Sequence, residues 1–161
     1  MRGFFNLLIV ILTLLVAVVL QILPIPEQFA NFRPDWLLAC VFYWCIALPM
    51  RFNVLGAFIC GLVLDLLLGS TLGIRALSFS LIGYIAAINY VRLRNLSLWQ
   101  QAIVFALTCI ANKAVIFWIN YIVHGVQAPV GYFYSAIGSL IIWPWIYLLL
   151  RKLRRRFRME A

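Results

Sequence analysis

Two charged residues stand inside apolar stretches, and they are the first candidates for chemistry. Asp65 lies in the stretch 54–68 and Lys113 in the stretch 98–123. A charged side chain in hydrocarbon costs about 2.5–3.5 kcal/mol on insertion scales, so both should face protein or water. If both stretches are helices that start at the same membrane face, Asp65 lies about 18 Å and Lys113 about 22 Å along its axis. The similar depth indicates that the two charges could pair in a buried polar site.

This polar site allows two interpretations. In the functional one, Asp65, Lys113 and Arg75 line a polar pocket. In the structural one, Asp65 braces the loop that follows it, and Lys113 either neutralises the acid or extends its ammonium group toward water. The sequence favours the structural interpretation.

Sequence motifs of enzymes are absent from the chain. There is no HExxH, GxSxG or P-loop, and no pair of carboxylates at a spacing suited to acid–base work. The four cysteines lie in apolar stretches without a CxxC pair or a histidine cluster, which is typical of small buried hydrophobic residues. We expect a protein that is not an enzyme, with no catalytic residue, no cofactor and no metal.

The elements that must position these residues follow from composition. The chain has 161 residues, of which 66% are hydrophobic and 11% charged. Soluble domains average about 45–50% apolar and about 25% charged residues. We therefore predict an all-α integral membrane protein, with residues 1–150 forming a bundle of six transmembrane helices and 151–161 a basic tail. The predicted helices span residues 4–23, 35–48, 54–68, 76–91, 98–123 and 132–150.

The distribution of basic residues predicts orientation. Ten of the 13 Lys and Arg residues fall in alternate gaps between the apolar stretches. Because basic residues in short loops stay in the cytoplasm, both termini are predicted to be cytoplasmic. Six of the ten are in the tail, where each could also add about 1 kcal/mol of attraction to anionic lipid. The formal net charge of +9 therefore does not indicate nucleic acid. The tail residues are Arg151, Lys152, Arg154, Arg155, Arg156 and Arg158.

Small and aromatic residues give candidates for a partner interface. Small residues four apart let helix backbones approach closely, which serves packing within the bundle first and contact with a partner second. The glycines of the stretch 69–73 are better suited to a helix end and turn, with Gly69 at positive φ. The candidates are Ala57, Gly61, Gly69, Gly73, Gly83, Ala87, Trp143 and Trp145.

Several short motifs, taken in order, resemble one bacterial family. They are Arg33-Pro34-Asp35-Trp36, Leu64-Asp65-Leu66, Gly69-Ser70-Thr71-Leu72-Gly73, Arg94-Asn95-Leu96 and Trp143-Pro144-Trp145. Together they are similar to the rod shape-determining protein MreD of proteobacteria, and the similarity covers nearly the whole chain.

This resemblance implies a multi-pass protein of the bacterial inner membrane that acts as a scaffold or regulator of cell-wall elongation. Its implied partner is a bitopic MreC-like protein, with indirect links to the MreB filament, the RodA glycosyltransferase and a penicillin-binding transpeptidase. The helices would clasp the partner's single transmembrane helix, and the loops 27–35 and 69–75 would orient its periplasmic domain. A homodimer is possible. The family is also similar in architecture to the substrate-binding subunits of energy-coupling-factor transporters.

Two alternatives stay open. The chain could be a ligand-binding or transport subunit with an outward-facing polar pocket around Asp65, Lys113 and Arg75. It could also be a membrane chaperone without a fixed partner, in which case no stoichiometric MreC-like protein would co-purify.

Overall fold

The computed structural model describes residues 2–125 and 130–157, which form seven α-helices and two short 3-10 helices, with no strand among them. In chain order the elements are α1 (Arg2–Ile22), η1 (Glu27–Phe32), α2 (Trp36–Ala47), α3 (Val54–Leu67), α4 (Ile74–Ile88), α5 (Tyr90–Asn95), α6 (Leu98–His124), η2 (Val130–Tyr134) and α7 (Ser135–Arg156).

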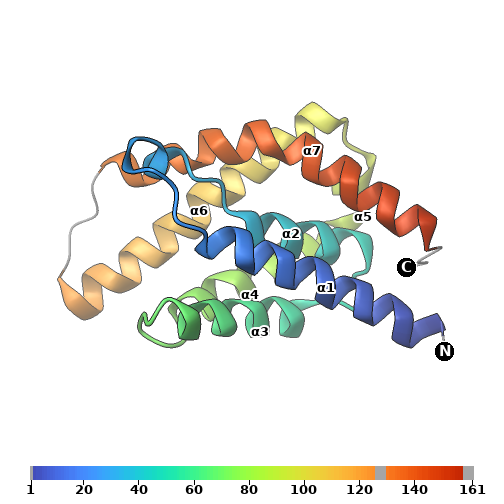
Figure 1. Cartoon of the computed structure of the whole chain (residues 1–161), viewed down its shortest axis with the longest axis horizontal. Coiled ribbons are helices and arrows are strands. Elements are labelled where there is room, and N and C mark those ends of the chain that lie inside the picture. The colour runs from blue at the N-terminus through green and yellow to red at the C-terminus, as the bar shows by residue number, and fades with distance from the viewer. Residues whose placement is uncertain (1, 126–129, 158–161) are drawn as a thin grey trace.

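The long helices lie roughly along one direction, and the bundle has two distinct ends (Figure 1). One end holds the start of α1, the turn between α2 and α3, the short helix α5 and the end of α7; we call it the terminal end. The opposite end holds η1, the loop between α3 and α4, the end of α6 and η2; we call it the loop end.

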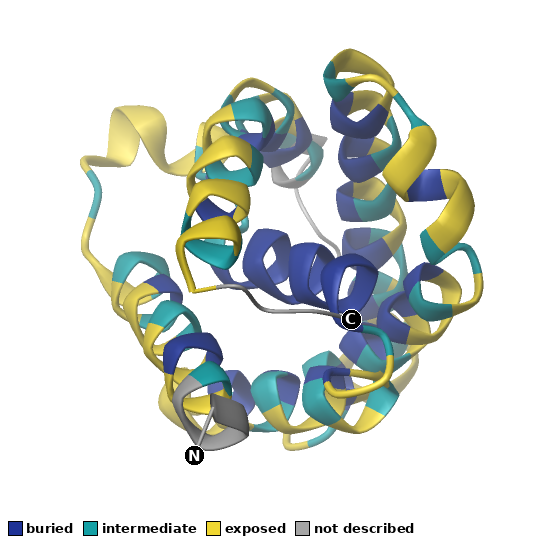
Figure 2. Ribbon diagram, turned by 90° about the vertical axis from the view of Figure 1, so that its right-hand side faces the viewer, coloured by how far each residue is buried: buried dark blue, intermediate teal, exposed yellow. Residues whose placement is uncertain are grey.

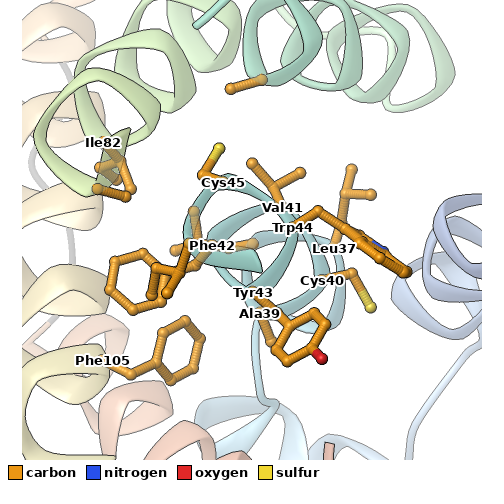
Figure 3. Close-up of a cluster of buried hydrophobic side chains, with 14 of the residues drawn as sticks. Leu37, Ala39, Cys40, Val41, Phe42, Tyr43, Trp44, Cys45, Ile82 and Phe105 are labelled. Atoms are coloured by element: carbon orange, nitrogen blue, oxygen red, sulfur yellow. The ribbon is translucent and has the colours of Figure 1, made fainter. Parts of the chain in front are cut away.

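Helix α2 is the centre of the bundle. Its residues from Leu37 to Ala47 are all buried, and it packs against each of the other described α-helices. A helix that is apolar all round has no face suited to water, so it lies inside other elements. Figure 2 shows this buried helix inside a ring of helices, and Figure 3 shows its side chains leaving it on all sides. At 12 residues α2 is about 18 Å long, well short of a bilayer's hydrocarbon thickness of about 30 Å.

Helices α3 and α4 form the closest pair, and small residues allow it. A Cβ atom added to Gly83 would lie 2.8 Å from the Cβ of Ala57, and one added to Gly61 would lie 2.5 Å from the Cα of Ala76. Ala57, Gly61 and Gly83 are buried in this contact, while Ala87 is half-buried. The structure therefore uses three of the interface candidates for packing within the bundle.

The helix bounds differ most from the predicted ones in three places. The predicted helix 76–91 is divided at Asn89, where the carbonyl of Ile85 accepts from both the side-chain amide of Asn89 (2.9 Å) and its backbone N–H (3.2 Å). Residues 132–134 belong to η2, so α7 begins only at Ser135. The basic segment continues α7 to Arg156, because Arg, Lys and Leu are good helix formers and cations suit a helix C-terminus. Arg158 lies outside the described residues.

Large apolar side chains cover the outside of the bundle. Ile122 and Trp145 are each 76% exposed, and Leu149 is 69% exposed. Soluble monomers rarely show contiguous apolar surface of this extent, so the exterior is suited to lipid. Helices α6 and α7 are long and apolar enough to cross a membrane, whereas α3, α4 and the apolar part of α1 are shorter.

Candidate functional site

Asp65 caps a neighbouring helix. Its carboxylate accepts hydrogen bonds from the backbone N–H groups of Gly73 (3.0 Å), Arg75 (3.1 Å) and Ala76 (3.3 Å), which form the start of α4. The first N–H groups of a helix have no partner within it, and a negative charge there is stabilised by the helix dipole. The side chain of Asp65 is fully buried, so these bonds replace the water that it lacks.

The loop between α3 and α4 is folded around this carboxylate. Gly69 has a φ of +60°, as predicted, and it ends α3 in a Schellman motif. In this motif the Gly69 N–H donates to the carbonyl of Leu66 and the Ser70 N–H to the carbonyl of Asp65. Gly73, at a φ of +99°, then turns the chain into α4. Gly61, one turn before Asp65, leaves room for the backbone of α4 to reach the acid.

The Arg75 guanidinium completes the bracing of the loop. Its Nη1 lies 3.4 Å from Oδ1 of Asp65 and donates to the Ser70 hydroxyl oxygen at 2.6 Å. The Ser70 hydroxyl in turn donates to Oδ1 of Asp65 at 3.1 Å. The carboxylate of Asp65, the Ser70 hydroxyl and the Arg75 guanidinium therefore hold one another in place at this loop.

Lys113 pairs with a different acid from the one that the sequence suggested. Its Nζ lies 3.8 Å from Oδ1 of Asp35, directly before α2, rather than forming a salt bridge with Asp65. The N–H of Asp35 donates to the hydroxyl oxygen of Ser139 on α7. Asp35 and Lys113 thus join the start of α2 to α6 and α7 at the loop end.

A polar cavity of about 170 Å³ lies between these two ion pairs. Charged and amide side chains line one part of it and apolar side chains the rest. Of the three pocket candidates predicted from the sequence, Arg75 and Lys113 line the cavity. Asp65 is not among the lining residues. The lining residues are Gln21, Arg33, Asp35, Leu37, Leu38, Leu64, Leu68, Arg75, Phe79, Asn112, Lys113 and Ile116.

Two lining residues that sequence reasoning did not single out carry unused hydrogen-bonding groups. Nε and Nη2 of Arg33 and Oδ2 of Asp35 are buried, and none has a hydrogen-bond partner among the described residues. Nε and Nη2 on one guanidinium can bind a carboxylate or phosphate in bidentate fashion. The sequence feature that could have identified Arg33 and Asp35 is the segment Arg33-Pro34-Asp35, which places opposite charges directly before an apolar helix.

The aromatic candidates on α7 point to opposite environments. Trp143 is fully buried and stacks on Phe105, with ring centroids 4.4 Å apart, while Phe42 meets it edge-on at 5.4 Å. Trp145, two residues on, is 76% exposed. Trp143 is therefore a core residue that joins α2, α6 and α7, and Trp145 is available to lipid or a partner.

An apolar groove of about 260 Å³ runs between α1 and α7, and α2 forms its floor. Thr13 is the one hydroxyl residue in its wall, and that hydroxyl is occupied, since it accepts from Nε1 of Trp44. The groove is lined by Leu12, Thr13, Val16, Ala17, Leu20, Trp36, Cys40, Ile146, Leu149 and Leu150.

The comparison with known proteins decides the family. The family model described as rod shape-determining protein MreD matches residues 1–153. The chain belongs to the MreD family. It is 39% identical over 149 residues to the rod shape-determining protein MreD of Haemophilus influenzae, and the match covers 90% of each chain. No solved structure matches the chain, so the similarity to energy-coupling-factor subunits stays a prediction.

Membership of the MreD family gives the chain a role in rod-shape determination. The helical bundle with its apolar exterior agrees with a shape protein that is associated with a membrane.

Proposed function

We propose that the chain is a non-enzymatic membrane scaffold and regulator of cell-wall elongation, and that it holds the transmembrane helix of an MreC-like bitopic partner. Family membership supports the cellular role. The groove between α1 and α7 is the observation that carries the binding mode, because its lining is apolar and exposed side chains stand at its edges.

The groove suits a partner helix rather than a polar ligand. Nearly all of its lining side chains are aliphatic or aromatic, and Val16 (50% exposed) and Leu149 (69% exposed) stand at its two rims. Between helices in lipid, association depends on close packing more than on the hydrophobic effect, so an existing groove favours one helix over bulk lipid. Ala17, a small residue at 2% exposure, lies in the α1 wall of the groove.

In this proposal the bundle spans the inner membrane six times with the terminal end in the cytoplasm. The basic residues of α5 and α7 gather at that end, and basic residues are retained on the cytoplasmic side. The loop end then faces the periplasm, where η1 and the loop at 68–73 would meet the partner's periplasmic domain. Through the partner the chain would act on the MreB filament, the RodA glycosyltransferase and a transpeptidase.

Site-specific crosslinking in cells tests the binding mode. A photo-crosslinking amino acid at Leu12 or Leu149, in the groove, should capture an MreC-like protein. The matched control is Leu107 on α6, which is 60% exposed, close to the 56% of Leu12, and lies outside the groove. Equal capture from Leu107 and Leu12 would contradict a defined binding face, and rods that survive clean deletion of the chain would contradict the scaffold role.

A second candidate function, ligand binding from outside, is favoured by the unused groups of Arg33 and Asp35 in the polar cavity. The cavity of about 170 Å³ is smaller than the sites of about 300–1,000 Å³ that hold drug-sized molecules, so its ligand would be small. Isothermal titration of the purified chain with small carboxylates and phosphates, compared with Arg33→Gln, tests it. A binding heat that Arg33→Gln leaves unchanged would dismiss this function.

A further inference from the structure

A second polar pocket, of about 220 Å³, lies at the terminal end of the bundle. Three helices build it: α2 supplies its floor, and α5 and α7 supply its two walls. Its lining residues are Tyr43, Ile46, Ala47, Arg94, Asn95, Tyr147, Arg151 and Arg154.

The charge in this pocket is of one sign. Arg94 comes from α5, and Arg151 and Arg154 come from α7, three residues apart and so on the same face of the helix. None of the three forms a salt bridge with another described residue. Of the four acidic residues in the chain, Glu27, Asp35 and Asp65 lie at the loop end, and Glu160 lies outside the described residues.

The floor of the pocket presents an unused hydroxyl group. Tyr43 is only 3% exposed, and its hydroxyl oxygen is buried without a hydrogen-bond partner among the described residues. The ring is held in place by edge contacts with Trp44 and Tyr147, at centroid distances of 5.3 and 5.5 Å. A buried hydroxyl without a partner costs free energy, so a fixed hydroxyl beneath three guanidinium groups indicates a missing acceptor.

We propose that this pocket is a binding site for the phosphate group of an anionic membrane phospholipid. Arginine side chains bind phosphate oxygens in charge-assisted hydrogen bonds, and the Tyr43 hydroxyl donates to one of the same oxygens. Basic pockets between transmembrane helices on the cytoplasmic side are a recognised setting for anionic head groups. The site rests on the proposed placement of the terminal end in the cytoplasm, and it is independent of any protein partner.

The surroundings favour a lipid over a free phosphate compound. On α7, one turn before Arg151, Leu148 is 48% exposed, and Val91 on α5 is 54% exposed. A head group held in the pocket would therefore leave its acyl chains beside apolar surface. Arg94 and Arg151 are themselves exposed, so a head group reaches the pocket without opening the bundle.

The test is native mass spectrometry of the full chain, released from phosphatidylcholine nanodiscs that contain a small fraction of phosphatidylglycerol. The wild type should retain one phosphatidylglycerol molecule in preference to phosphatidylcholine. Arg94→Gln and Arg151→Gln should each weaken this retention about fivefold, the change expected for one basic residue at a membrane surface. Tyr43→Phe, which preserves the ring, should weaken it without any change of charge.

The matched control is Arg155→Gln, which removes the same charge from an exposed position on α7 outside the pocket. It should retain the lipid as the wild type does. Equal losses in Arg155→Gln and Arg151→Gln would overturn the site in favour of diffuse attraction. Displacement of the lipid by millimolar inorganic phosphate would overturn the lipid as its occupant. If Arg151→Gln fails to fold, Arg94→Gln on the separate short helix α5 decides the matter.

Discussion

Replacement of Asp65 gives the sharpest measure of what a buried carboxylate does in this fold. Asp65→Ala removes the acceptor for three backbone N–H groups at the start of α4, those of Gly73, Arg75 and Ala76. A buried donor left without a partner costs about 1–3 kcal/mol, so three of them cost at least about 3 kcal/mol. A chain of this size loses about 2–4 °C of Tm per kcal/mol, which gives a fall of at least about 6–12 °C.

Asp65→Asn should be milder. The amide keeps one oxygen, which can still accept from the backbone of α4, but its NH₂ group then faces the Arg75 guanidinium across the 3.4 Å that the salt bridge occupied. Loss of the charged acceptor and of its interaction with the helix dipole amounts to about 2 kcal/mol, or about 4–8 °C.

Thermal unfolding in detergent, followed by loss of the monodisperse size-exclusion peak, measures both variants. Glu27→Gln is the control, since Glu27 is an exposed acid at the same end of the bundle, and its Tm should change by no more than about 1–2 °C. A Tm for Asp65→Ala within that range would refute the capping role, because it would mean that the N–H groups of α4 find other partners.

Three further variants test other contacts. Gly83→Val places methyl groups where even an added Cβ would lie 2.8 Å from the Cβ of Ala57, so it should lower the free energy of unfolding by about 1–3 kcal/mol, seen as a lower Tm. Adding Ala57→Gly should restore part of the loss. Lys113→Met removes the ammonium group that lies 3.8 Å from Asp35 and should lower the free energy of unfolding by about 3–5 kcal/mol. The double variant with Asp35→Asn should recover most of that loss in the same assay. No recovery would contradict the pairing of the two residues. Trp143→Ala removes a fully buried ring and should cost about 3–5 kcal/mol in denaturant unfolding.

Much of the helical layout could be predicted because hydrophobic stretches and breakers are local signals. Pro24, Pro49 and the glycine at 69 mark helix ends directly, and the observed helices begin and end near them. The division at Asn89 could not be predicted from the apolar pattern, since apolar residues continue on both sides of this asparagine.

The members of the candidate site were predictable only in part, and their pairing was not. Asp65 stood out because a lone carboxylate precedes a glycine-rich turn, and the bracing role followed from that order. Depth along a helix axis does not fix rotation about it, so Lys113 was as compatible with Asp65 as with Asp35. The central position of α2 could not be predicted from the sequence either. All the long helices are rich in apolar residues, and only their packing decides which of them is enclosed by the others.

The joined pair α3–α4 has a mechanical consequence. Small residues fix the two helices along their length, and a carboxylate of one grips the first turn of the other, so neither can slide or rotate alone. The pair should therefore move as a single stiff lever. A displacement imposed on this pair at the terminal end of the bundle would then also move the loop at 68–73, which gives a shape protein a direct way to couple the two ends of its bundle.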